Sequence, residues 1–470
     1  MRRETVTADH AQAVRDVHAA LKSLLGERLL DDPGDRYPYS YDNSRQQALP
    51  DLVAFPESHD EVLAIIRACH EHDLPLVSRG LGSGTAGAAV PVAGGLVLAL
   101  ERMNRIVRID AANRVAVVQP GVTNAQLQEA AGREGFFWPP DPTSSAYSTV
   151  GGNLACNSAG PRAVKYGTPR DNALGLRAIA GDGTELRTGV YTTKGVVGYD
   201  LTRLLIGSEG TLGVITEATL KLTPLQPAKH TLRATFNDMT AAAAAVSRIM
   251  AQPVTPCALE FIDATAIAMI HDYAETDLPT NAGTMLLIEV DGQSEFLDAA
   301  TALVARAVEG EGLIELHRAQ TSEETRALWA ARKALSPALR KIAPKKINED
   351  VVVPVSRMAE LIGGLQELSR QHDITIVNFG HAGNGNIHVN LLVDPDDARQ
   401  MAVADQCLND VFALVLELGG TLSGEHGIGL VKKEYVGLEI EPGTLAMMRR
   451  IKAQFDPKGI LNPGKFFPEV

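Results

Sequence analysis

The chain has 470 residues, of which 45% are hydrophobic and 21% are charged, so it is long enough to form two or three domains with a core each. Its 44 basic and 57 acidic residues give a formal net charge of -13, which argues against a nucleic acid as its partner. A local basic funnel for a small anionic substrate is compatible with this charge.

The first half of the chain reads as short strands, tight turns and a few helices. Residues 10–30 have the spacing of an amphipathic helix, and helices are also expected over residues 59–72, capped by Ser58, and 124–132. Between residues 52 and 222, short β-rich runs such as GLVLAL and RVAVVQP alternate with glycine turns. This mixture indicates an α+β domain.

A glycine-rich loop follows the apolar run at residues 74–77. Its segment GLGSGTAG contains G-x-G-x-x-G, starting at Gly82, which is the fingerprint of a Rossmann dinucleotide site when a helix follows. Pro91 and the two glycines shortly after it interrupt any such helix. Backbone N–H groups of a glycine-rich turn bind phosphate without a helix behind them, so the loop predicts a pyrophosphate held by loops.

The second half has a different pattern of expected helices and strands. The segment TPLQPAK at residues 223–229 indicates a domain boundary, and beyond it strands alternate with long helices such as that expected over 323–341. This pattern predicts an antiparallel sheet with helices on one face. We expect domains at 1–227 and 228–421, and a C-terminal segment at 422–470 that folds back on the first domain.

The stretch VNFGHAGNGNIHVNLLV places two histidines on either side of a tight turn. Its glycines and Asn-Gly steps bring His381 and His388 within reach of each other, and period-two alternation places His388 and Asn390 on one face. Downstream, Glu425 and His426 lie between glycines in SGEHGIG. Two histidines and a carboxylate form a ligand set for a divalent metal with open positions. The alternative is that these histidines are ordinary polar side chains of a glycine loop.

Other candidate residues lie on a helix and in loops. Arg332 is by default a solvated helix residue, but Ser336, one turn later, shares its face and would help it bind a carboxylate. Three glycine-rich runs of the first domain, STVGGNLACNSAG, YGTPRDNALG and IGSEGTLGVIT, suit a flat ligand that needs close backbone approach, with Asn153 available to bond it. The alternative for each run alone is a simple turn between strands.

The cysteines and the hydropathy indicate a compartment. The four cysteines form no C-x-x-C pair, which argues against a disulfide framework and an iron-sulfur cluster and favours the cytoplasm. No apolar run reaches about 18 residues, the length that indicates a transmembrane segment, and the first residues lack the apolar region of a signal peptide. We therefore expect any membrane contact to be peripheral.

The chain contains, in this order, the motifs PLVSRGLGSGTAG, STVGGNLACNSAG, YGTPRDNALG, IGSEGTLGVIT, VNFGHAGNGNIHVNLLV, SGEHGIG and DPKGILNPGK. Their sequence and order resemble those of the FAD-linked D-2-hydroxy acid dehydrogenases of the vanillyl-alcohol-oxidase superfamily. The resemblance extends from about residue 52 to residue 465. Its branches include D-2-hydroxyglutarate dehydrogenase, cytochrome-linked D-lactate dehydrogenase and the flavin subunit of glycolate oxidase. It implies an α+β fold with a discontinuous FAD-binding domain of the PCMH type, an antiparallel-sheet substrate domain, and a C-terminal segment that closes on the flavin.

The resemblance implies FAD bound without a covalent link, because Ser83 stands where covalent members often carry a histidine. The implied FAD contacts are Arg79, Gly80, Leu81, Gly82, Ser83, Gly84, Thr85, Pro142, Thr143, Ser144, Gly151, Gly152, Ser158, Tyr166, Gly167, Glu209, Gly210, Ile215 and Asn462.

The resemblance also implies roles around the substrate. The implied metal ligands are His381, His388 and Glu425, with zinc as the expected ion; the implied catalytic residue is His426; and the implied substrate-binding residues are Arg332, Ser336 and Asn390. Asn390 matches the hydroxyglutarate branch, whereas GEHGIG is closer to the lactate and glycolate branch. Lys345 and Lys346 fall only near the lysine that binds a second carboxylate in the hydroxyglutarate branch.

The implied reaction oxidises D-2-hydroxyglutarate, D-lactate, D-malate or glycolate to the 2-oxo acid. A metal would chelate the substrate, His426 would take the hydroxyl proton, and the hydride would pass to flavin N5. The electrons would leave through an external quinone, cytochrome or electron-transfer flavoprotein. A homodimer is one assembly compatible with the sequence. A metal-dependent hydrolase using the His/His/Glu site and a non-catalytic flavin-binding module are the alternatives.

Overall fold

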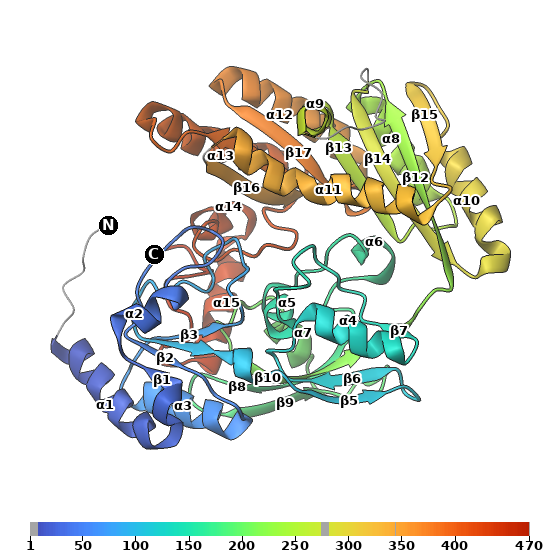
Figure 1. The fold of residues 1–470 in the computed structure, drawn as a ribbon. Helices are drawn as coiled ribbons and strands as arrows, with labels where there is room; N and C mark the ends of the chain where they lie inside the picture. Colours follow the sequence, from blue (N-terminus) through green and yellow to red (C-terminus); the bar gives the residue numbers. More distant parts are fainter. Residues whose placement is uncertain (1–7, 274–281, 344, 470) are drawn as a thin grey trace. The chain divides into compact units, whose positions relative to one another are not determined.

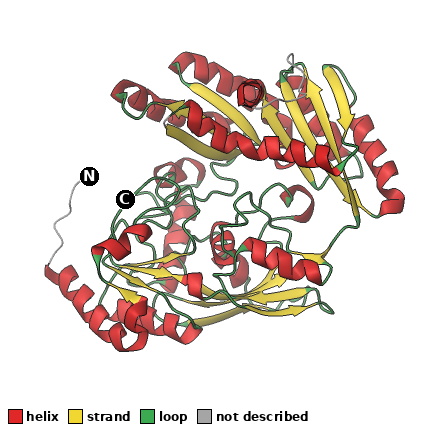
Figure 2. Ribbon diagram, in the orientation of Figure 1, coloured by secondary structure: helices red, strands yellow, loops and turns green. Residues whose placement is uncertain are grey.

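The computed structural model describes residues 8–273, 282–343 and 345–469. The chain divides into two compact units (Figure 1), and each contains both helices and strands (Figure 2). The first unit comprises Met1–Ala159, Thr168–Leu225 and Glu425–Val470, and the second comprises Gly160–Gly167 and Gln226–Gly424. Each unit therefore joins segments that are distant in the sequence.

A four-stranded sheet and two helices form one part of the first unit. Helices α1 (Ala8–Leu25) and α3 (His59–Glu71) each bury an apolar stripe against the sheet, and the side chain of Ser58 caps α3 as predicted. Strands β2, β4 and β3 are parallel, and β1 pairs antiparallel with β2. In spatial order the strands are β1 (Leu29–Leu30), β2 (Leu52–Ala54), β4 (Leu96–Ala99) and β3 (Leu76–Arg79).

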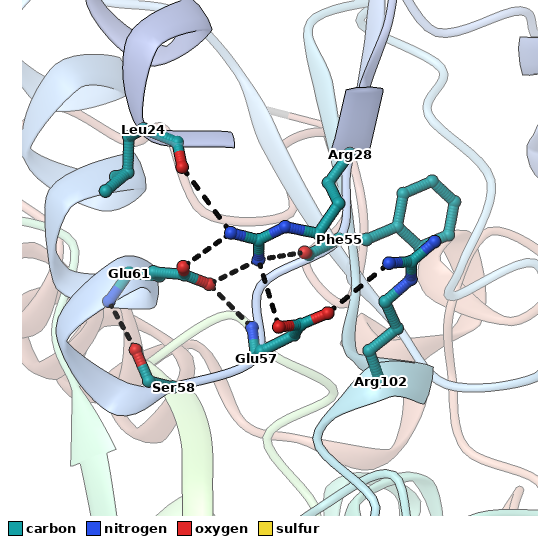
Figure 3. Close-up of polar contacts among 7 residues, drawn as sticks. All are labelled: Leu24, Arg28, Phe55, Glu57, Ser58, Glu61 and Arg102. Carbon is teal, nitrogen blue, oxygen red and sulfur yellow. Dashed lines mark hydrogen bonds and ion pairs between the residues drawn. The ribbon is translucent and has the colours of Figure 1, made fainter. Parts of the chain in front are cut away.

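A polar cluster ties this part together (Figure 3). The guanidinium of Arg28, just after α1, donates to both carboxylate oxygens of Glu61 on α3, at 2.6 and 2.7 Å, and to the carbonyl of Phe55 at 3.1 Å. The same carboxylate accepts from the N–H of Glu57 at 2.7 Å. The cluster thus holds the end of α1 against the start of α3.

A five-stranded antiparallel sheet forms the other part of the first unit. Its core surrounds Trp138 and includes apolar side chains of the helices α4 (Asn124–Arg133), α5 (Val150–Cys156) and α7 (Leu201–Leu205). In spatial order the strands are β5 (Ile106–Asp110), β6 (Val115–Val118), β10 (Val214–Lys221), β8 (Ala173–Ile179) and β9 (Glu185–Gly189). A two-stranded sheet joins β11 (Thr223–Pro224) to β7 (Phe136–Phe137).

The C-terminal segment completes the first unit. Ile451 and Phe455 of helix α15 (Pro442–Phe455) pack against the core around Trp138. Further along, Leu461 forms a parallel bridge with Leu76 of β3. Leu461 therefore lies beside the strand that precedes the glycine-rich loop.

The second unit is built on a seven-stranded sheet in which every neighbouring pair is antiparallel, which confirms the predicted antiparallel sheet. In spatial order the strands are β15 (Leu313–Arg318), β12 (Ala228–Phe236), β14 (Thr284–Gly292), β13 (Ala258–Asp263), β17 (Thr375–His381), β18 (Asn386–Val393) and β16 (Lys345–Val352).

Helices pack on both faces of this sheet, whereas the sequence pattern predicted them on one face. Thr301 of α10 (Ser294–Val308) hydrogen-bonds to His230 on one face, and α10 contacts α8 (Met239–Ala251). Helix α8 contacts α12 (Met358–His372), which contacts α13 (Ala398–Glu417). On the opposite face, α9 (Ala264–Tyr273) and α11 (Ser322–Ile342) enclose a core with Ile262, Met285 and Phe379. The amphipathic stripe of α11 explains this second layer, because its apolar residues need a partner face.

Two global expectations can be compared with the structure. None of the helices within the described residues is both long enough and apolar enough to cross a lipid bilayer. The four cysteines all lie in the described part of the chain, and none forms a disulfide.

Candidate functional site

The side chain of Arg79 lies directly against the glycine-rich loop of the first unit. Residues 80–95 form turns and bends, and the next regular element is strand β4, so no helix follows the glycines. The guanidinium of Arg79 donates to the carbonyl of Tyr41 at 2.7 Å and lies 5.7 Å from the ring centroid of Tyr39. Gly82 has a φ of 68°, and a Cβ there would come within 2.1 Å of Arg79 Nη2. The loop therefore requires glycine at this position.

This loop presents backbone N–H groups. Within the described residues, none of the N–H groups of 81–85 donates to another protein group. Neighbouring N–H groups in a glycine turn form a nest for an anion. A Cβ on Gly80 would meet Thr149 Oγ1 at 2.4 Å, so the loop also lies against the start of α5, where Gly151 and Gly152 form the first turn. The residues present fit a phosphate-bearing cofactor.

Other predicted FAD residues converge on the same region of the first unit. The side-chain amide of Asn462 donates to the carbonyl oxygens of Glu209, at 2.7 Å, and Ala88, at 3.0 Å. Gly210 has a φ of 72°, and a Cβ there would lie 2.5 Å from Ser78 Oγ. Three further residues form the turn before α5, and one is a buried residue of β10: Pro142, Thr143, Ser144 and Ile215.

Two predicted FAD residues belong to the second unit. Tyr166, in helix α6 (Ala163–Tyr166), donates from its hydroxyl to Asp291 at 2.6 Å. Gly167 follows with a φ of 80°. Burial raises the pKa of the Tyr166 hydroxyl, and the hydrogen bond to Asp291 acts in the same direction.

The loop that carries His426 is anchored within the first unit. The hydroxyl of Ser158 donates to the carbonyl of Glu425 at 2.7 Å. The carboxylate of Glu209 accepts from the N–H of Ile428 at 2.6 Å and from that of Gly429 at 2.8 Å. His426 therefore lies between two anchored backbone positions.

His381 and His388 lie side by side on β17 and β18 of the second unit. The two strands form a hairpin through the short turn Ala382–Asn384, and Gly385 takes a φ of 68° there. The ring centroids of the two histidines are 5.2 Å apart with an interplanar angle of 84°. His381, His388 and Glu425 each offer one potential ligand atom, and these three atoms all lie within 4.8 Å of one another.

Asp350 fixes the backbone immediately before Glu425. It stands opposite His388 on β16, and its carboxylate accepts from the N–H of Gly424 at 2.8 Å and from the hydroxyl of Ser423 at 3.1 Å. Gly424 is the last residue of the second unit, and Glu425 is bonded directly to it. The sequence reasoning missed this buried aspartate.

The fit of this cluster to a metal rests on its donors. Two imidazoles and a carboxylate suit zinc or a similar divalent cation and leave positions open. The Nδ1 atom of His381 lies 2.5 Å from an oxygen of Glu260, so Nε2 is the ring nitrogen that would bind an ion.

Glu260 links this histidine to Arg332. Its other carboxylate oxygen, Oε2, is 2.9 Å from Arg332 Nε and 2.7 Å from Nη2, and the guanidinium lies 4.8 Å from the ring centroid of Phe379. Burial acts to raise the pKa of Glu260, but His381 and Arg332 outweigh it and lower that pKa. The side chain of Arg332 is 11% exposed and forms an ion pair, so it is not the solvated helix residue of the alternative. A lone carboxylate in the apolar run ALEFI was the available signal for Glu260.

Asn390, Ser336 and Lys345 are the other residues considered around the substrate. Asn390 is fully buried, and its amide donates to the carbonyls of Val377 and His388, each at 3.0 Å. The side chain of Ser336 lies outside the described residues, although its backbone belongs to α11. Lys345 directs its ammonium to Met401 of α13, 3.8 Å away.

Two family models match the chain. The FAD binding domain matches residues 50–189, and the FAD linked oxidases, C-terminal domain, matches residues 225–466.

Several named relatives align over most of the chain. Glycolate oxidase subunit GlcD of Bacillus subtilis (strain 168) is 41% identical over 455 residues, which are 96% of this chain and 97% of that protein. Glycolate oxidase subunit GlcD of Escherichia coli (strain K12) is 34% identical and covers 96% of this chain and 91% of its own. D-lactate dehydrogenase of Archaeoglobus fulgidus is 37% identical over 414 residues, covering 88% and 90% of the two chains.

Solved structures share the fold at low identity. The structure of p-cresol methylhydroxylase with substrate bound has a TM-score of 0.80 and 17% identity, covering 100% of this chain and 99% of its own. That of 4-ethylphenol oxidase from Gulosibacter chungangensis has a TM-score of 0.78 and 19% identity, covering 99% of each chain. The fold predicted from the sequence, that of the vanillyl-alcohol-oxidase type, is thereby confirmed.

Proposed function

Because the chain belongs to the FAD-linked oxidases, we propose that it oxidises a short D-2-hydroxy acid of the glycolate or D-lactate class to the 2-oxo acid. The observation that carries the proposal is the group of His381, His388 and Glu425, joined through Glu260 to Arg332. A cation site beside an arginine suits a substrate whose carboxylate and 2-hydroxyl are adjacent.

Each end of the substrate has a partner in this proposal. Arg332 binds the carboxylate, which its planar guanidinium matches in geometry. His381, His388 and Glu425 would hold a divalent cation, with zinc as the expected ion; when bound, the cation lowers the pKa of the substrate hydroxyl. Asn390 and Ser336 are proposed to line the same substrate site.

His426 is proposed as the base that takes the hydroxyl proton. It is bonded to Glu425, and its loop is anchored by Ser158 and Glu209. An imidazole is suited to this task near neutral pH. The loop at 79–85 and the residues around it would hold FAD without a covalent bond, and FAD would supply the hydride acceptor when bound.

The substrate is proposed to carry one carboxylate. A second carboxylate would call for a further cation, and Lys345 is one of two lysines near the expected position. The ammonium of Lys345 lies against Met401 of α13, which packs with α12 on one face of the sheet. His388 lies on the opposite face, together with Phe379. Lys346, the next residue, alternates to the face of Asp350 and His388, so the lysines alone do not separate the substrates. The similarity to glycolate oxidase subunit GlcD and to D-lactate dehydrogenase is what favours glycolate and D-lactate over D-2-hydroxyglutarate and D-malate.

Absorbance and metal analysis of the purified protein test the proposal. We expect yellow protein with flavin absorbance and a bound divalent metal. A colourless protein that FAD does not reconstitute would favour the metal-dependent hydrolase instead. Bound flavin that no 2-hydroxy acid reduces would favour a non-catalytic flavin-binding module.

A further inference from the structure

We propose that Glu260 is a positioning residue that sets the metal-binding histidine and the substrate-binding arginine at the same time. The inference rests on the proposed function and adds to it a residue that contacts neither FAD nor, in our account, the substrate. Its carboxylate divides its two oxygens between the two sites: Oε1 bonds to His381, and Oε2 bonds to Arg332.

The contact with His381 fixes the state of that ring. Glu260 stands directly opposite His381 in the pairing of β13 with β17, and its oxygen lies 2.5 Å from Nδ1. An imidazole that donates its Nδ1 proton to a carboxylate presents the lone pair of Nε2, and it is held in one orientation. Carboxylate partners of this kind make histidine a stronger metal ligand.

The contact with Arg332 fixes a group on a different element. Arg332 lies on α11, and two of its nitrogens, Nε and Nη2, approach the same oxygen of Glu260 at 2.9 and 2.7 Å. The ring of Phe379 supports the guanidinium from one side, at 4.8 Å from its centroid. Because Nε and Nη2 meet Glu260, the Nη1 side of the guanidinium is the part that would meet a substrate carboxylate.

Stability alone does not require a carboxylate at this position. Glu260 is 1% exposed and lies between the apolar residues Leu259 and Phe261 of β13. Removing a carboxylate from water is costly, and an apolar side chain of similar size is often as stable as a buried ion pair. A residue whose role is to hold His381 and Arg332 in register explains why a charge is present.

The variant Glu260→Gln tests this role. Glutamine keeps the size of the side chain but has one acceptor oxygen, so it serves His381 or Arg332 but not both. We expect zinc affinity, measured by competition with a chromophoric chelator, to fall by roughly 10- to 100-fold, as is usual when such a partner is lost. We also expect KM for D-lactate or glycolate to rise more than kcat falls, with flavin content unchanged.

Glu289→Gln is the matched control. Glu289 is also buried, at 5% exposed, and lies on the neighbouring strand β14, but it is bonded to Lys229 at 2.9 Å and to Trp329 at 3.0 Å. Its loss removes a buried carboxylate from the same sheet without touching His381 or Arg332. Zinc affinity and KM should stay at the wild-type values.

The outcomes separate this inference from the proposed function. If wild-type protein binds zinc and Glu260→Gln binds it equally well with an unchanged KM, the inference is wrong and the function stands. If wild-type protein has no measurable affinity for a divalent metal, both the metal part of the function and this inference are wrong. Should Glu260→Gln not fold, Glu260→Asp replaces it; this variant keeps the charge but shortens the reach, and wild-type zinc affinity and KM in it would overturn the inference.

Discussion

The carboxylate of Glu209 accepts a hydrogen bond of 2.6 Å from the backbone N–H of Ile428, two residues beyond His426. A second bond, from the N–H of Gly429, is 2.8 Å long. Glu209 is 5% exposed and has a φ of 52°, a conformation that non-glycine residues rarely adopt. A buried carboxylate in strained backbone thus holds the loop that carries the proposed base.

We expect Glu209→Gln to lower both stability and turnover. The amide offers one acceptor where two N–H groups need one each, and an unsatisfied buried donor costs about 1–3 kcal/mol. Thermal unfolding and kcat measure the two effects, and flavin content is read alongside, because Glu209 is also predicted to contact FAD. A variant with wild-type kcat and melting temperature would show that the loop is positioned by other contacts.

Replacing Arg332 with lysine separates charge from shape. Lysine keeps the positive charge but cannot bond to Glu260 and a substrate carboxylate in the geometry of a guanidinium. Hydrogen bonds to charged groups contribute about 1.5–3 kcal/mol, so kcat/KM should fall roughly 10- to 100-fold. Flavin absorbance should stay the same. Unaltered kinetics in Arg332→Lys would remove this residue from the substrate site.

Glu425 and His426 are adjacent but are assigned different work. Glu425→Ala should lose metal, and a high concentration of added metal should restore part of the activity, since the defect is one of affinity. His426→Ala should keep metal and flavin while kcat falls by about 10²- to 10⁴-fold, the usual contribution of a general base. Metal content and steady-state kinetics of both variants make the comparison. If His426→Ala loses metal as completely as Glu425→Ala, the histidine is a ligand and the base lies elsewhere.

The Arg28–Glu61 pair predicts a pH dependence of stability. The hydrogen bonds of Arg28 lower the pKa of Glu61, against the opposing effect of burial. A carboxylate with a lowered pKa in the folded state stabilises the protein above its unfolded pKa, and this stabilisation is lost as the pH falls through the folded value. Glu61→Gln should therefore reduce the free energy of unfolding by about 1–3 kcal/mol at pH 7.

The difference between Glu61→Gln and wild type should shrink as the pH falls below about 4, the usual range of glutamate. Urea unfolding at several pH values measures it. Glu129→Gln is the control, because the ion pair of Glu129 with Arg133 is mostly exposed and contributes little. A difference that persists unchanged at low pH would mean that packing, and not charge, explains the effect of Glu61→Gln.

The sequence predicted the local features of the fold well. Helices expected at 59–72 and 124–132 are found at His59–Glu71 and Asn124–Arg133, because caps and apolar periodicity are local signals. The interruption at Pro91 also correctly excluded a Rossmann helix. The layer formed by α9 and α11 was missed, since the face that a helix covers depends on the tertiary arrangement of the sheet.

The site shows the same division between local and distant signals. The nearness of His381 and His388 follows from a hairpin of a few residues. Glu260 lies 121 residues before His381 and 72 before Arg332, and no local pattern joins three such positions. Asp350 was missed for the same reason, as its contact with Gly424 spans 74 residues. Residues that orient the functional groups are thus the part that the sequence alone does not reveal.

Anaerobic mixing of the flavin-loaded protein with 2-hydroxy acids tests the central claim most directly. The panel contains glycolate, D-lactate, L-lactate, D-malate and D-2-hydroxyglutarate, and the loss of flavin absorbance is followed in time. We expect glycolate or D-lactate to bleach the flavin fastest and L-lactate to be poor, with the bleaching abolished by a metal chelator. A flavin that no member of the panel reduces, or that L-lactate reduces best, would contradict the account.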